Sequence, residues 1–142
     1  MAILGDAIFA RLTAHTGTYA LVARRVYPLR LPQGSGAPKV PYPAVRYQVF
    51  ERPRTHLMGA DLNERHAEVQ VDCYAETYRG AHTLAAQVIS ALSRYEGTSG
   101  SVVVLHFFLD GSLDMDEPAV RTPQGEEGIF RVMLQFTAHW ED

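Results

Sequence analysis

The chain carries one cysteine, six histidines and sixteen acidic residues, the side-chain types most often used in catalysis. Cys73 could act as a nucleophile, but it falls on the apolar side of an alternating segment, where a thiol is normally an inert small hydrophobe. No Gly-x-Ser-x-Gly segment occurs; Ser99 and Ser101 stand in a Gly/Ser turn without that spacing. The Gly-Ser-Gly at 34–36 lacks the Gly-Lys-Ser/Thr ending of a phosphate loop. We therefore expect no catalytic residues and no enzyme.

The histidines do not show the spacing of a local metal site. No His-x-x-x-His or His-Glu-x-x-His pair occurs, so no single element presents two imidazoles together. A single cysteine also excludes an intrachain disulfide and a multi-cysteine zinc site. A metal site would have to be assembled from distant parts of the chain, and we expect neither a metal nor a cofactor. The six histidines of the chain are His15, His56, His66, His82, His106 and His139.

Hydrophobic periodicity predicts the elements that must position these residues. Residues 44–51 and 65–75 alternate apolar and polar side chains, the period of half-buried strands, and we expect them to pair as an antiparallel hairpin. After Thr77, a suitable N-cap, apolar residues from Ala81 to Leu92 recur every three or four positions, which predicts a long amphipathic helix. A shorter N-terminal helix over 1–15, a helical turn over 18–23 and two further strands over 102–109 and 128–140 complete the predicted elements.

Three segments lack such periodicity and are expected to be loops. Residues 31–43 hold four prolines, 52–63 contain Pro53 and Gly59, and 110–127 are rich in acidic residues. The chain is thus predicted to be one α+β domain spanning 1–142. Its core is a four-stranded, mainly antiparallel sheet with a long helix packed on one face and a shorter N-terminal helix.

Composition limits the class of protein. With 142 residues, 46% hydrophobic and 20% charged, the chain has ordinary globular composition and enough length for a sizeable core. A net charge of −3 argues against broad nucleic-acid binding, which usually needs a basic surface. The sequence contains no run of about 18 apolar residues, the length needed to cross a membrane. Its N-terminal residues lack the basic start of a signal peptide. We therefore expect a soluble protein that is intracellular or assembled from the cytoplasm.

The small net charge hides two oppositely charged segments. Residues 24–54 contain seven basic residues and one acid, whereas residues 110–127 contain six acids and one arginine. Such opposite blocks suit head-to-tail association of subunits, although both segments could simply be solvated. The acidic candidates are Asp110, Asp114, Asp116, Glu117, Glu126 and Glu127. The candidates for subunit or tube contacts are Arg24, Arg25, Arg52, Arg54, Leu57, Met58 and Leu62.

The order of several short motifs carries a family resemblance. Arg-Val-Tyr-Pro at 25–28 and Pro-Tyr-Pro-Ala-Val-Arg-Tyr at 41–47 follow the N-terminal helix. Val-Gln-Val-Asp-Cys-Tyr-Ala-Glu-Thr-Tyr at 69–78 precedes the Ala/Leu-rich helix, and Phe-Arg-Val at 130–132 lies in the closing strand. In this order and spacing, the chain resembles the tail completion (tail terminator) family of long-tailed phages and gene transfer agents.

The resemblance implies a structural role in the tail–neck region of a virion assembled in the host cytoplasm. Family members form a six-membered ring on the completed tail tube, stop its polymerisation and offer the surface that joins the filled head. The implied partners are further copies of the chain, the tail tube protein and a head–tail connector or stopper. DNA would pass through the lumen without specific binding. No catalytic residue, cofactor or membrane contact is implied.

The acidic segment suggests a finer hypothesis. Six copies of it would place a large negative charge on the ring, and Asp114, Asp116 and Glu117 at or near the lumen would repel DNA so that it slides instead of sticking. Two alternatives stay open. One is a head–tail connector of the stopper type, and the other is a small α+β binding domain that uses its sheet. Tyr47 beside Arg46 is the one hint of nucleic-acid stacking.

Overall fold

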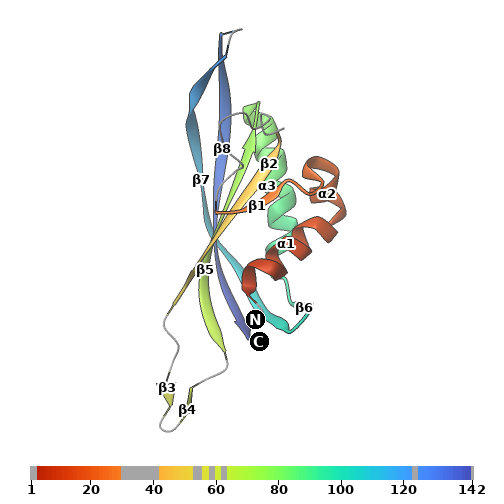
Figure 1. The fold of residues 1–142 in the computed structure, drawn as a ribbon, viewed down its shortest axis with the longest axis vertical. Coiled ribbons are helices and arrows are strands. Elements are labelled where there is room, and N and C mark those ends of the chain that lie inside the picture. The colour runs from red at the N-terminus through yellow and green to blue at the C-terminus, as the bar shows by residue number, and fades with distance from the viewer. Residues whose placement is uncertain are drawn as a thin grey trace.

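The computed structural model describes residues 3–29, 42–52, 56–57, 60–61, 64–122 and 125–141. Three helices, α1 (Leu4–Ala14), α2 (Thr16–Val22) and α3 (Tyr78–Leu92), lie on one face of a twisted sheet (Figure 1). We call the opposite, helix-free side of the sheet its outer face. None of the described helices has the length and apolar character needed to cross a membrane.

The sheet has six strands in the order β1-β2-β5-β8-β7-β6. The strands β1 and β2 pair in parallel, and the other neighbours pair antiparallel. A separate pair, β3 and β4, lies in the connection between β2 and β5. The strand bounds are Val26–Pro28 (β1), Ala44–Glu51 (β2), His56–Leu57 (β3), Ala60–Asp61 (β4), Arg65–Ala75 (β5), Gly97–Ser99 (β6), Val102–Thr122 (β7) and Gly125–Glu141 (β8).

The most strongly periodic segments fold as the sequence predicts. The strands β2 and β5 have the expected bounds and pair antiparallel, with Val45 opposite Cys73 and Val49 opposite Val69. Thr77 caps α3, because its Oγ1 accepts a hydrogen bond of 2.9 Å from the Gly80 backbone N–H. In each case one face of the element is buried, and burial imposes the alternation or helical stripe that the sequence displays.

The predicted four-stranded sheet is wrong in strand number, whereas its mainly antiparallel pairing is confirmed. The structure adds β1 and β6 at the two edges, and β1 makes the sheet mixed. Each of these strands has only three residues, too few for an alternating pattern to be recognised.

The predicted loop over 110–127 is also wrong. The strands β7 and β8 pair almost continuously, as far as Thr122 opposite Gly125. The strand β5 ends at Ala75, opposite Phe130, so the pairs from Glu117–Ile129 onward form a two-stranded extension, which we call the β7–β8 ribbon. Among the described strands, only β7 and β8 form this ribbon, so its residues need not follow the alternation of the sheet, and this explains the error. The ribbon and the β3–β4 pair lie at opposite ends of the molecule (Figure 1).

The core lies between the sheet and the helices. The helix α3 buries Leu84, Val88 and Leu92 completely against the inner face. The sheet contributes its largest side chains there, including Phe136 and Trp140, and each is at most 1% exposed. Burial of one such side chain is worth about 1.5–3 kcal/mol. This core holds β5 and β8 in a fixed register, and that register positions the polar residues of the outer face.

Candidate functional site

A buried ion cluster lies at the centre of the outer face. Asp72 of β5 is completely buried, and Arg46 of β2 is its direct cross-strand neighbour. The Arg46 Nε donates a hydrogen bond of 2.9 Å to Asp72 Oδ2, and the Arg46 Nη2 contacts the same oxygen. The Arg131 Nε lies 3.1 Å from the other carboxylate oxygen, and the Gln70 amide donates to Oδ2 at 3.1 Å. A buried carboxylate is stable only when it is paired in this way, so Asp72 ties β2, β5 and β8 together.

The described acidic candidates are anchored to the protein. Asp114 accepts a 2.7 Å hydrogen bond from the Tyr78 hydroxyl and lies 3.0 Å from His82 Nε2, so it joins β7 to α3. The hydrogen bond to Asp114 raises the pKa of Tyr78. Asp110 accepts a 2.5 Å hydrogen bond from the Thr137 hydroxyl. The backbones of Glu117, Glu126 and Glu127 belong to the ribbon, and Asp116 lies at its base, opposite Phe130. The side chains of these four acids lie outside the described residues.

The basic candidates also contact other groups. Arg24 lies over the Phe9 ring at 5.3 Å, and Arg25 donates hydrogen bonds to the carbonyls of Pro43 and Leu21. Arg52 pairs with Glu68 across the hairpin. Arg46 and Arg52 are each paired with an acid from β5. These acids partly neutralise the basic segment, so the electric field around it is weaker than its count of basic residues suggests. Arg54, Met58 and Leu62 lie outside the described residues, as does the side chain of Leu57.

The single cysteine belongs to the core, as the sequence predicts. Cys73 is completely buried on the inner face of β5. Burial, with a smaller contribution from the Asp72 charge, raises the pKa of the thiol far above its ordinary value. A thiol in this environment is neutral and inaccessible, the opposite of a reactive cysteine.

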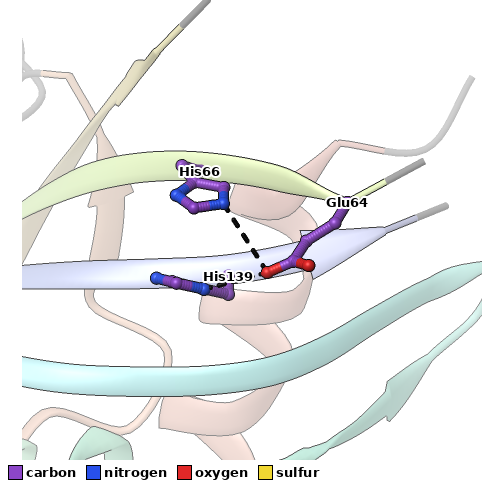
Figure 2. A group of neighbouring side chains, drawn as sticks. All are labelled: Glu64, His66 and His139. Atoms are coloured by element: carbon purple, nitrogen blue, oxygen red, sulfur yellow. Dashed lines mark hydrogen bonds and ion pairs between the residues drawn. The ribbon is translucent and has the colours of Figure 1, made fainter. Parts of the chain in front are cut away.

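Two groupings on the outer face lie beyond what local sequence spacing can reveal. One is the Asp72 cluster. The sequence pattern that could have predicted it is an acid at an interior strand position, with an arginine at the paired position of the neighbouring strand. The other joins His66 and His139 with Glu64, although the two histidines lie far apart in the sequence (Figure 2). Only the register of β5 against β8, with His66 opposite His139, brings this second group together.

The two sides of the sheet carry open strand edges. Among the described residues, β6 covers only Val102–Val104 of β7, and the long remainder of β7 has a strand neighbour on the β8 side alone. On the opposite side, within the part of the chain that the structure describes, the pairing of β1 with β2 ends at Tyr47. A mainly apolar cavity of about 410 Å³ borders the uncovered part of β2 and is lined in part by Ile3, Leu29 and Val49. Open edges of this kind are templates for pairing with another chain.

The fold therefore defines a class, a small α+β protein with open strand edges among its described residues. A family model, Tail completion protein gp17, matches residues 6–141, and the chain belongs to this family. It is a structural protein of a phage-type tail, of a family that is not typically enzymatic.

Two solved structures share the fold. A chain from the "Virion of native gene transfer agent (GTA) particle" superimposes with a TM-score of 0.65 at 20% sequence identity, covering 98% of this chain and 95% of that one. A second solved chain, which carries no functional name, superimposes with a TM-score of 0.53 at 15% identity, covering 96% of each chain. No curated protein matches the sequence.

Proposed function

We propose that this protein caps the end of the tail tube as a ring of six copies, stops tube polymerisation and forms the tail side of the head–tail junction. Membership of the tail completion family carries the proposal. In this role the protein contacts the tube protein on one side and a connector or stopper on the other. It acts in the tail–neck region, after assembly in the host cytoplasm.

The two open edges support a ring. They lie on opposite sides of the sheet, at β7 and at β2 beyond Tyr47. Contact between different patches of identical subunits is heterologous, and such contacts generate a closed ring when the rotation between subunits closes. A neighbour's β7 edge beside β2 would extend the sheet from subunit to subunit and would also approach the apolar cavity next to Val49.

Imaging tail tubes mixed with the purified protein by negative stain tests the proposal. We expect a cap at one end of each tube and no elongation when tube protein is added afterwards. A variant with residues 117–129 replaced by a two-residue turn leaves Asp116 opposite Phe130, keeps every β5–β8 pair and separates the ribbon's contribution from that of the domain. Binding to connector rings but not to tube ends would favour the stopper alternative, and continued elongation of saturated tubes would refute capping.

We further propose that the acidic ribbon lies at or near the lumen, where it repels DNA. Asp114 also contacts α3, so Asp116→Lys/Glu117→Lys is a cleaner charge reversal than one that includes Asp114. Particles with this variant should assemble normally and eject DNA more slowly. Glu96→Lys/Glu141→Lys, which reverses two charges at the end of β7 and β8 opposite to the ribbon, is the matched control. Ejection at the wild-type rate from normally assembled particles would exclude a luminal ribbon.

A further inference from the structure

We propose that Glu64, His66 and His139 form a binding site for a divalent transition-metal ion of the zinc class. The site lies on the outer face, at the end of the sheet where β5 begins and β8 ends (Figure 2). His66 and His139 are direct cross-strand neighbours on this face, and Glu64 precedes β5 by one residue. Cross-strand pairing places their Cβ atoms about 4.5–5.5 Å apart, so two imidazoles can bind one ion.

The distances fit a metal centre after a small adjustment. The Glu64 Oε1 lies 2.9 Å from His139 Nδ1 and 3.6 Å from His66 Nε2, and all three ligand atoms lie within 4.8 Å of one another. Ligand atoms bound tetrahedrally to zinc at about 2.0–2.1 Å are about 3.4 Å apart. Binding would therefore open the Glu64–His139 contact of 2.9 Å slightly and bring any wider pair, at most 4.8 Å apart, closer together, a change of the size that side-chain rotation allows.

The ligand set selects the kind of ion. Two imidazole nitrogens and one carboxylate suit zinc, cobalt, nickel or copper, whereas calcium and magnesium prefer oxygen ligands throughout. The side chains of Glu64, His66 and His139 are 41%, 46% and 25% exposed, so the ion can enter from solvent and keep water in its fourth position. A divalent cation would also balance the Glu64 charge.

The side chains around the site show which residues belong to it and which do not. The His139 ring packs against His66 at a centroid distance of 4.1 Å, and His106 of β7 lies on its other side at 6.1 Å. His106 faces Glu96 and stacks on Phe108, and it is not among the three residues whose ligand atoms converge. The proposed ion would bridge β5 and β8, the two central strands, near the end of their pairing.

The experiment uses the full chain without a histidine tag, freed of metal with a chelator. Titration with Co²⁺, followed by visible absorption, reports coordination directly, and competition with Zn²⁺ gives its affinity and stoichiometry. We expect one ion per chain. His66→Asn, His139→Asn and Glu64→Gln should each weaken binding about ten-fold or more, since loss of even an outer-shell partner costs that much. Acidification should release the ion, because protonated imidazole does not bind metal.

His82→Asn is the matched control. His82 is similarly exposed at 44% and has one carboxylate neighbour, Asp114, at 3.0 Å, but no second imidazole joins them among the described residues. This variant should bind Co²⁺ like the wild type. Added Zn²⁺ should also raise the melting temperature of the wild type and of His82→Asn, but not that of His66→Asn. Wild-type affinity in a folded His66→Asn/His139→Asn variant, or no binding by the wild type, would overturn the proposal.

Discussion

Replacement of Asp72 by Asn should cost far more stability than removal of the same charge elsewhere on β5. Asp72 is completely buried and bridges Arg46 and Arg131, whose side chains are only 21% and 15% exposed. The Asp72→Asn variant would leave two guanidinium groups around a neutral amide whose NH₂ points donors at donors. Breaking a buried pair in this way typically costs about 3–5 kcal/mol. For a chain of this size, the melting temperature should fall by about 10–17 °C.

The matched control is Glu68→Gln, which removes one negative charge from the same face of the same strand. Its partner Arg52 is 57% exposed, and an exposed pair is worth about 0–1 kcal/mol. Urea unfolding followed by the fluorescence of Trp140, the one tryptophan, measures both variants. Equal losses of unfolding free energy in Asp72→Asn and Glu68→Gln would refute the argument that burial makes the Asp72 cluster important.

Three further outcomes follow from the fold. Thr77→Ala should lower the unfolding free energy by about 1 kcal/mol through loss of the cap on α3, whereas Thr83→Ala on the exposed side of that helix should not; urea unfolding distinguishes them. Phe136→Ala should cost about 3–5 kcal/mol, because it empties a completely buried site, and calorimetry would show it. Since the pKa of Cys73 is raised in the folded protein, its contribution to stability is full below the ordinary thiol value of 9.0 and is lost above it. From pH 9 to pH 10 the unfolding free energy of the wild type should fall about 1 kcal/mol further than that of Cys73→Ala, and the difference in slope approaches about 1.4 kcal/mol per pH unit above pH 10.

Where one face of an element is buried, the sequence predicts the structure well. The alternation of β2 and β5 and the apolar stripe of α3 reflect the same requirement, that one side faces the core and the other faces water. The ribbon escapes prediction because, among the described strands, only β7 and β8 form it, and its sequence need not follow the period of the sheet. Leu113, on β7 as it approaches the ribbon, is 52% exposed, so apolar residues on this part of the strand do not report a buried face.

The candidate sites are harder to predict, because they depend on pairings between strands. Asp72 looks like an ordinary polar residue of an alternating strand until Arg46 and Arg131 close over it from the strands on either side. His66 and His139 look isolated until the β5–β8 register places them side by side. Local spacing reveals motifs within one helix or loop, whereas these groups form only when the sheet is complete.

The unequal pairing of the strands also determines how the amide hydrogens should exchange with solvent. The strand β5 has hydrogen-bonded neighbours on both sides along most of its length, whereas in the ribbon β7 and β8 pair with each other and with no third strand among the described residues. Exchange from the centre of β5 therefore requires global unfolding, and exchange from the ribbon requires only local opening. A partner that binds the ribbon would slow exchange there and leave the centre unchanged. Assembly of the tail would thus be recorded residue by residue as a local gain in protection.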